Sequence, residues 1–334
     1  MSIECEIKEK FKQNAVLVDK YIFENIQVKT PNELYEASLH LIKGGGKRLR
    51  PYLVSKSCEI VGGDIMKSIP FGAALELLHT FTLVHDDIMD NDNKRRGIKT
   101  VHNKYQSKNK AILVGDLLYS KVYDVVLNQK KIQDVNKIIC CMKLITNGII
   151  SLNEGQYFDI MFPDINNVSE NEYIKMVSGK TAVLFKVCAE VGSIIGGGNA
   201  EQISNLGEFA YNIGIGYGLL DDILGITGDE KKLGKPIGSD LREGKKTLII
   251  IHALNNSTVS QNKKIKSVLG NKHISNNNIF EVNEILETIG SLEYSRKKAK
   301  EYVDNGVKKL KIFQNSVAKS DLEKLAYYFI QRTY

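Results

Sequence analysis

The stretch "GAALELLHTFTLVHDDIMD" (72–90) is apolar on most sides of the helix that its pattern predicts, as expected for a helix buried inside a bundle. Its last turns are acidic, and Asp86 and Asp90, four residues apart, share one helix face. The next segment, "NDNKRRG" (91–97), is rich in residues that end helices. The carboxylates therefore come at the negative end of the helix dipole, where cations are needed to offset them.

Most of the chain shows the same helical period, with apolar residues at three- and four-residue steps and only 5 prolines in 334 residues. No linker or fixed-length repeat interrupts it. We therefore predict one all-α domain over residues 1–334, a large helical bundle that is dimeric because its length exceeds the usual size of a single core. Helices are predicted at 72–90, 109–128, 133–161, 170–196, 201–224, 245–256, 279–313 and 319–331, and a surface excursion at 257–278.

The composition, 43% hydrophobic and 25% charged, is ordinary for a soluble globular protein. The N-terminus carries Glu early and does not resemble a signal peptide. No apolar run approaches the ~20 residues that span a bilayer, so we expect a cytoplasmic protein without stable membrane insertion. The cysteines show no paired metal spacing and are predicted to be buried thiols in a reducing compartment: Cys5, Cys58, Cys140, Cys141 and Cys188.

The net charge of +7 is distributed over short segments. Basic residues recur beside glycines and aspartates in "GGGKRLRP" (44–51), "NKRRG" (93–97) and "LREGKKT" (241–247). This distribution favours several small anion contacts over one nucleic-acid stripe, and no nucleic-acid-binding module is present. A loop that enters a helix at Pro51 is the structural alternative for the first segment.

Two interpretations of the first acidic cluster stay open at this point. Asp86 and Asp90 could be solvated acids paired with Arg95 and Arg96. Alternatively they bind Mg²⁺, which prefers one or two carboxylates, waters and substrate phosphate oxygens, and the arginines bind phosphate in a forked geometry.

A second segment repeats this layout. In "YNIGIGYGLLDDILGITGDEKKLGKP" (211–236) an apolar helix leads into Asp221 and Asp222, and a loop with glycines and lysines follows. If the two helices face each other, the acids converge on the mouth of one central substrate cavity. Such a site suits a diphosphate held with Mg²⁺, with its hydrophobic tail between helices.

Five ordered segments then carry a specific resemblance: "GGKRLRP" (45–51), "ELLHTFTLVHDDIMDNDNKRRG" (76–97), "SGKTAVLF" (178–185), "GLLDDILG" (218–225) and "GKPIGSDLREGKKT" (234–247). With them the chain resembles the trans-isoprenyl diphosphate (polyprenyl) synthases, nearest the archaeal short-chain type that makes farnesyl and geranylgeranyl diphosphate. The resemblance implies the isoprenoid synthase type I fold. It also implies Mg-dependent condensation of isopentenyl diphosphate with an allylic diphosphate, for isoprenoid lipid synthesis.

The resemblance also implies roles for individual residues. Three Mg²⁺ ions are bound by Asp86, Asp90 and Asp221. The allylic diphosphate is held by Arg95, Lys180, Lys235 and Lys245, and isopentenyl diphosphate by Lys47, Arg50, His79 and Arg96. The allylic cation is stabilised at Thr181 and the carbonyl of a kinked helix at Lys180, and the released diphosphate takes the final proton.

Product length is expected to depend on the helix that carries the first cluster. Phe81 is bulky and lies one to two turns before the acids, Thr82 is small, and Leu78 lies deeper. In the resembled family this pattern fits products of fifteen to twenty carbons, so we expect geranylgeranyl diphosphate, with some farnesyl diphosphate.

Two positions depart from the family pattern, and two other functions remain open. Gly225 stands where a third aspartate is usual, and Gly218 where a glutamine is usual. Both glycines would fit a non-catalytic subunit that modulates a partner synthase. A class I terpene cyclase shares the first acidic motif, but it would have no second substrate for the "KRLRP" segment.

Overall fold

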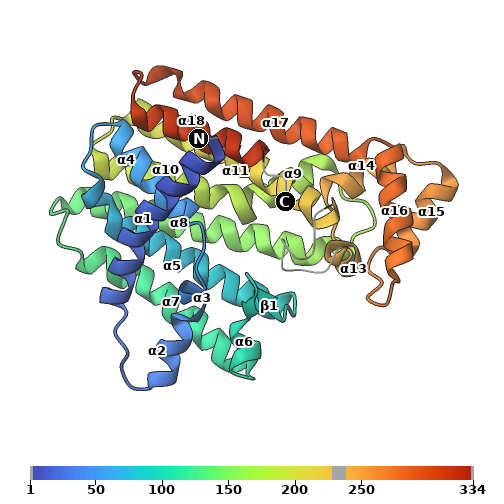
Figure 1. The fold of residues 1–334 in the computed structure, drawn as a ribbon, viewed down its shortest axis with the longest axis horizontal. Helices are drawn as coiled ribbons and strands as arrows, with labels where there is room; N and C mark the ends of the chain where they lie inside the picture. Colours follow the sequence, from blue (N-terminus) through green and yellow to red (C-terminus); the bar gives the residue numbers. More distant parts are fainter. Residues whose placement is uncertain (1–2, 228–237, 332–334) are drawn as a thin grey trace. The chain divides into compact units, whose positions relative to one another are not determined.

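The computed structural model describes residues 3–227 and 238–331, whose regular secondary structure is helical apart from one short hairpin. The prediction of an all-α protein is therefore confirmed (Figure 1). Its helices are α1 (Ile3–Asn25), α2 (Asn32–Ser38), α3 (His40–Lys43), α4 (Leu49–Ile60), α5 (Ile65–Met89), α6 (Val101–Lys104), α7 (Lys108–Asn128), α8 (Val135–Met161), α9 (Glu170–Val177), α10 (Val183–Gly196), α11 (Ala200–Thr227), α13 (Ser239–Glu243), α14 (Leu248–Asn256), α15 (Val259–Val268), α16 (Asn276–Thr288), α17 (Ser291–Lys309) and α18 (Val317–Ile330). Short irregular turns are η1 (Phe162–Asp164), the π-helix η2 (Ser178–Ala182) and η3 (Leu310–Ile312), and β1 (Lys94–Arg95) pairs with β2 (Ile98–Lys99).

The chain divides into two compact units, each described here by itself. The first comprises Met1–Thr146, Val187–Gly207 and Leu310–Leu325. The second comprises Asn147–Lys186, Glu208–Lys309 and Ala326–Tyr334. The prediction of one domain over the whole chain remains a prediction.

Helix α5 is central to the first unit, where it packs against α1, α4 and α7. It begins at Ile65, seven residues before the predicted start, because the side chain of Asp64 accepts a hydrogen bond from the backbone N–H of Met66 (2.9 Å) and caps the helix. Its apolar side chains are buried along most of its length, as predicted. It ends at Met89, and Asn91 follows with a left-handed φ of 55°.

Two predicted segments differ in detail. The expected excursion at 257–278 contains α15, which a capping box of Thr258 and Gln261 begins and which buries Ile265 and Val268. The predicted helix at 279–313 is divided between α16 and α17 at Gly290, which has a φ of 78°. Both differences come from local capping chemistry, which apolar periodicity does not report.

The cysteines follow the prediction only in part. Cys58, Cys141 and Cys188 are buried, whereas Cys5 and Cys140 are exposed, so the prediction was wrong for these two. Cys140 lies on α8, next to the buried Cys141, on a helix that presents one face outward.

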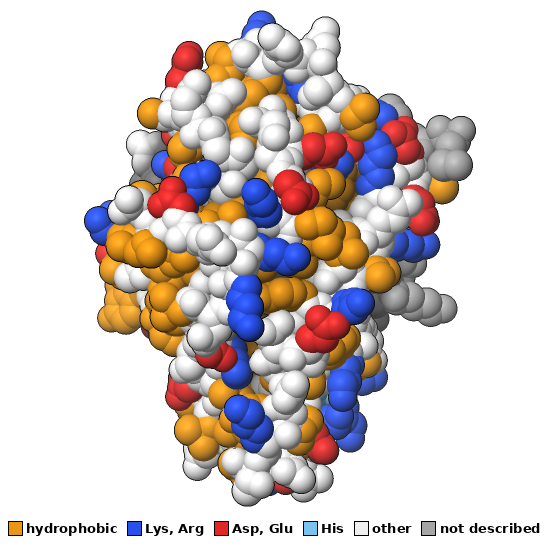
Figure 2. Space-filling view, turned by 90° about the vertical axis from the view of Figure 1, so that its left-hand side faces the viewer, with side chains coloured by type: hydrophobic (Ala, Val, Ile, Leu, Met, Phe, Trp, Pro, Cys, Tyr) orange, Lys and Arg blue, Asp and Glu red, His pale blue; other side chains and the backbone are white. Residues whose placement is uncertain are grey.

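One helical stretch, Val135–Asp164, is long and apolar enough by length and composition to cross a membrane, contrary to the expectation from the sequence that none is. A single such helix is weak evidence, since core helices of soluble proteins pass the same test. Only 28% of its most apolar window is buried. Figure 2 shows one face of the molecule, on which hydrophobic, basic and acidic side chains are interspersed.

Candidate functional site

The first acidic cluster lies at the C-terminal end of α5, as predicted. Asp87 is fully buried and its Oδ1 accepts a hydrogen bond from Nε of Arg95, whose Nη2 lies 3.6 Å from Asp86 and 3.4 Å from Asp92. Burial raises the pKa of Asp87 to about 6, although the Arg95 charge opposes this. Oδ2 of Asp87 is buried without a hydrogen-bond donor in the described structure. Arg95 therefore supplies the cation that the helix end needs, and the cluster retains unsatisfied acceptor capacity.

A tight hairpin presents the two arginines. Arg95 pairs with Ile98 in the β1–β2 ladder, and Arg96 and Gly97 between them have φ values of 53° and 80°. Positive φ at both central residues is typical of a two-residue hairpin turn. Nη1 of Arg96 donates to the backbone oxygen of Gly45 at 2.5 Å. The hairpin thus joins the "NKRRG" and "GGGKRLRP" segments.

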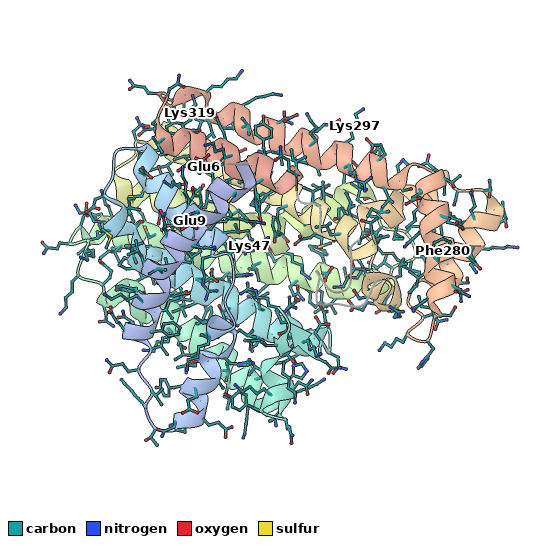
Figure 3. The ribbon with its side chains drawn as sticks, in the orientation of Figure 1. Glu6, Glu9, Lys47, Phe280, Lys297 and Lys319 are labelled. Carbon is teal, nitrogen blue, oxygen red and sulfur yellow. The ribbon has the colours of Figure 1, made fainter. Side chains whose placement is uncertain are left out.

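The loop after α3 carries the first basic motif, and the labelled side chain of Lys47 lies in it (Figure 3). Arg48 was not among the predicted site residues. It is 2% exposed and bonds to Asp19 (2.7 Å) and Glu76 (3.1 Å). A buried guanidinium must be paired, and these two ion pairs fix the end of the loop at Arg48. Its neighbours in the sequence, Lys47 in the loop and Arg50 in α4, are half-buried.

His79 lies among cations of the first unit. Burial lowers its pKa well below the ordinary value, and the nearby charges of Arg50, Arg96 and Arg95 lower it further. The imidazole is therefore neutral at pH 7, and one of its nitrogens can donate a hydrogen bond while the other accepts one. Arg50 and Arg96 are thus close enough to act on the charge of His79, and their shared role in binding isopentenyl diphosphate remains a prediction.

The predicted chain-length residue Phe81 lies in an aromatic row. Its ring centroid is 4.8 Å from that of His85 and 5.4 Å from that of Tyr119 on α7. The hydroxyls of Tyr119 and Tyr123 lie 3.1 Å apart. Thr82 is half-buried, and Leu78 is 1% exposed. Phe81 is thus backed by tyrosines that the sequence did not single out.

The second acidic cluster lies within α11, which continues to Thr227, beyond the predicted end at residue 224. Asp221 is exposed and Asp222 half-buried. The hydroxyl of the buried Tyr173 donates to Oδ2 of Asp222. Burial, reinforced by the charge of Asp240, raises the pKa of Asp222 to about 8. The charge of Asp222 therefore depends on its neighbours, while Asp221 is exposed.

Two predicted lysines of the second unit share one buried carboxylate. Oδ2 of Asp159 lies 2.6 Å from Nζ of Lys180 and 3.7 Å from Nζ of Lys245, and Asp159 is 8% exposed. Asp159, on α8, was missed. An acid among buried apolar positions must be paired with a cation, and that signal could have identified it.

The "SGKTA" motif forms the π-helix η2, an interruption of the predicted helix at 170–196. Such π-turns are frequent at functional sites, because they displace backbone carbonyls from the regular pattern. A close crossing accompanies it: a Cβ on Gly155 would lie 2.1 Å from the backbone nitrogen of Lys180, and one on Gly179 would lie 2.7 Å from the carbonyl oxygen of Ser151. Two glycines therefore let α8 lie against the segment that carries Lys180 and Thr181.

Gly218 and Gly225, the two departures from the family pattern, are both closely surrounded by other side chains. A Cβ on Gly218 would lie 2.7 Å from Cγ1 of Val177, and a Cβ on Gly225 would lie 2.7 Å from Oδ2 of Asp240. The space beside Gly225 is thus already filled by the carboxylate of Asp240.

Some of the predicted contacts stay predictions. Lys235 lies outside the described residues. Asp86 and Asp90 belong to the first unit and Asp221 to the second, so their convergence remains a prediction. In residues 3–227 and 238–331, no three His, Cys, Asp or Glu side chains form a metal-binding group.

The comparisons with known proteins agree with the motifs. The model of the polyprenyl synthetase family matches residues 31–288. A geranylgeranyl diphosphate synthase of Saccharolobus solfataricus is 43% identical over 301 residues, 90% of each chain. A short chain isoprenyl diphosphate synthase of Methanocaldococcus jannaschii is 40% identical over 98% of this chain and 100% of its own. The crystal structure of a geranylgeranyl pyrophosphate synthetase from Pyrococcus horikoshii superposes with a TM-score of 0.90, at 41% identity, over 99% of this chain and 98% of its own. The predicted family and its all-α fold are confirmed, and the chain belongs to the polyprenyl synthetase family.

Proposed function

We propose that the chain is a prenyltransferase that condenses isopentenyl diphosphate with dimethylallyl, geranyl and farnesyl diphosphate and releases mainly geranylgeranyl diphosphate. Relatives that cover most of the chain carry the name geranylgeranyl diphosphate synthase. The observation that carries the proposal is the pairing of cations with buried carboxylates in both units. Arg95 pairs with Asp87, and Lys180 pairs with Asp159. Such cations are held in place before an anionic substrate arrives.

The donor set fits a divalent cation. Asp86 and Asp90 share a helix face, and the neighbouring Asp87 has an unsatisfied oxygen. Asp86, Asp90 and Asp221 would hold Mg²⁺, three ions in all, together with phosphate oxygens. When bound, Mg²⁺ neutralises charge that develops on the departing diphosphate. Lys180 and Lys245 donate hydrogen bonds to the same diphosphate, joined by Arg95 and by Lys235.

The second substrate is assigned to the first unit. Lys47, Arg50 and Arg96 bind the diphosphate of isopentenyl diphosphate, and the neutral His79 donates a hydrogen bond to it. Arg48 stays with Asp19 and Glu76 and keeps the loop in position. Lys47, Arg50 and Arg96 thus bind substrate, whereas Arg48 supports the loop.

Carbon–carbon bond formation needs partial negative charge near the allylic carbon. The C–O bond of the allylic diphosphate breaks first, and its electron pair leaves with the diphosphate. The π-helical carbonyl at Lys180 and the hydroxyl of Thr181 stabilise the resulting cation. The double bond of isopentenyl diphosphate attacks it, and the released diphosphate accepts the proton lost from the adjacent carbon. No side-chain base is required.

Product length is set on α5. Phe81 limits the chain, Thr82 leaves space beside it, and Leu78 lies in the buried layer below. Tyr119 prevents the Phe81 ring from turning aside, because the two rings are in contact. Twenty carbons is the expected main product.

The chain is also proposed to be a cytoplasmic homodimer without stable membrane insertion. Large apolar side chains are exposed on one side of α8 and on α7, and a second copy of the chain would cover them. They are Ile112, Leu113, Leu127, Val135, Ile139, Ile150, Tyr157 and Ile160. Sedimentation of the purified chain measures this directly.

Incubation of the purified chain with Mg²⁺, isopentenyl diphosphate and each primer tests the activity, and the length of the product is read by mass spectrometry. We expect geranylgeranyl diphosphate, and loss of activity in Asp86→Ala. Release of a cyclic hydrocarbon without consumption of isopentenyl diphosphate would identify a terpene cyclase. No turnover unless a partner synthase is added would identify a modulatory subunit.

A further inference from the structure

A recess of about 450 Å³ lies in the first unit, and none of its lining residues is among those assigned to prenyl transfer. Its lining includes Glu36 of α2, His40 and Lys43 of α3, Gly44, and Lys104 and Tyr105 at the end of α6. Its volume falls within the range of small-molecule sites. No role in the proposed reaction accounts for it.

His40 is fixed in one protonation state. Its Nε2 lies 2.7 Å from the backbone oxygen of Lys99, which can only accept, so Nε2 carries the hydrogen. Its Nδ1 lies 3.1 Å from Nζ of Lys104 and accepts a hydrogen bond from that ammonium. His40 is therefore neutral, and it directs the charge of Lys104 into the recess.

The lysines of the recess lack carboxylate partners. Among residues 3–227 and 238–331, neither Lys43 nor Lys104 forms an ion pair with an acid, and Lys104 lies 5.4 Å from the ring centroid of Tyr105. The carboxylate of Glu36 is the opposing charge in the lining. Two ammonium groups beside a neutral histidine outweigh the single carboxylate of Glu36, so the lining carries net positive charge and favours an anion.

The other lining residues are aromatic or apolar, which indicates that the ligand has an apolar or aromatic part in addition to its negative charge. Tyr105 packs edge-on against His40, with ring centroids 6.4 Å apart, and burial raises the pKa of its hydroxyl. Val28 and Ile98 complete an apolar wall. The site thus suits a small phosphorylated molecule with an apolar or aromatic portion.

One lining residue, Gly44, begins the loop that carries Lys47. Gly44 packs so closely on Ile98 that a Cβ there would lie 2.4 Å from Cδ1 of that side chain. The next residue, Gly45, accepts hydrogen bonds from Arg96 (2.5 Å) and Arg48 (3.2 Å). A ligand against Gly44 therefore lies next to the residue whose carbonyl oxygen accepts a hydrogen bond from Arg96.

We propose that this recess binds a small phosphorylated molecule through Lys43 and Lys104, with its apolar or aromatic part against Tyr105. We further infer that a molecule bound in the recess changes the affinity of the neighbouring Lys47–Arg96 site for isopentenyl diphosphate. This second step rests on the proposed function.

Histidine NMR of the full-length protein in EDTA tests the site, with AMP and inorganic phosphate as separate probes. His40→Gln assigns the His40 resonance. AMP is expected to shift this resonance in a saturable way and to bind more tightly than inorganic phosphate, because it adds the ring contact. In the Lys43→Ala/Lys104→Ala variant the affinity should fall by about tenfold or more. Lys108→Ala, which changes an exposed lysine outside the recess, should leave it unchanged.

A His40 resonance that does not respond to either probe would overturn the site, as would equal affinity in the double-lysine variant. The second step is tested by steady-state kinetics with AMP: the KM for isopentenyl diphosphate should change and the KM for the allylic substrate should not. Kinetics unaffected by bound AMP would overturn the coupling alone. Failure of prenyl transfer itself would appear as absence of product in the unmodified protein, which leaves the binding measurement intact.

Discussion

Nζ of Lys180 lies 2.6 Å from Oδ2 of Asp159, which also lies within 3.7 Å of Nζ of Lys245. One buried acid on α8 thereby aligns two cations that come from η2 and from the loop before α14. The two lysines are far apart in the sequence, and their ion pairs with Asp159 hold their ammonium groups close together.

Replacement of this acid should reduce turnover more than it reduces substrate binding in the first unit. In Asp159→Asn the lysines lose their shared partner, and we expect kcat to fall by about 10- to 100-fold, because misplaced catalytic groups cost this much. The KM for isopentenyl diphosphate should not change. Asp164→Asn, an exposed acid close by in the sequence, is the matched control. Equal kinetics of the two variants would refute the positioning role of Asp159.

The aromatic row on α5 and α7 should control product length. Phe81→Ala removes the ring that packs against Tyr119, and products longer than twenty carbons are expected because the growing chain can pass that level. Adding Tyr119→Ala should lengthen them again, since this ring backs Phe81. The exposed Phe280 on α16, labelled in Figure 3, provides the control Phe280→Ala. Chromatography of the dephosphorylated products measures the distribution, and a distribution that stays the same in Phe81→Ala would contradict this role.

The neutral state of His79 should make stability depend on pH. Its pKa is lowered on folding, so the unfolded chain binds a proton that the native protein does not. This contribution to stability is present above about pH 6.5 and is lost as the pH falls below it. The free energy of unfolding should therefore decline as the pH falls from 6.5 to 5.5 because the unfolded chain takes up this proton.

Urea unfolding at pH 7.5, 6.5 and 5.5 compares the protein with His79→Gln. The free energy of unfolding of the variant should decline less steeply toward pH 5.5. Parallel declines would show that His79 is not held neutral.

The crossing of α8 and η2 should not tolerate a side chain. In Gly155→Ala the new methyl meets the backbone at Lys180 and Gly179 rather than a movable side chain. We expect a loss of about 1–3 kcal/mol in unfolding free energy, the usual cost of overpacking. Asn153→Ala, at an exposed position of the same helix, should cost far less. Similar thermal midpoints for the two variants would exclude a tight crossing.

The sequence predicted the long helices best where burial imposes a regular period, as in α5 and α7. It could not reveal that Asp64 extends α5, or that Thr258 and Gln261 start α15 in a polar segment, because single caps decide these boundaries. For the candidate site, the motifs singled out Asp86, His79 and Lys180, whose roles remain predictions. They could not distinguish Arg48, a buried structural cation, from its neighbours Lys47 and Arg50, since burial depends on distant partners such as Asp19 and Glu76. Asp159 was missed although an acid among the apolar positions of α8 was a signal that could have identified it.

The central claim is that the carboxylates of both units serve one diphosphate. Crystals grown with Mn²⁺ and a non-ionisable allylic diphosphate analogue test it through the anomalous signal of the metal. The account predicts metal ions bound by Asp86 and Asp90 and by Asp221, all in contact with the same diphosphate. A diphosphate bound to one acidic cluster while the other cluster binds metal elsewhere, or binds none, would contradict it.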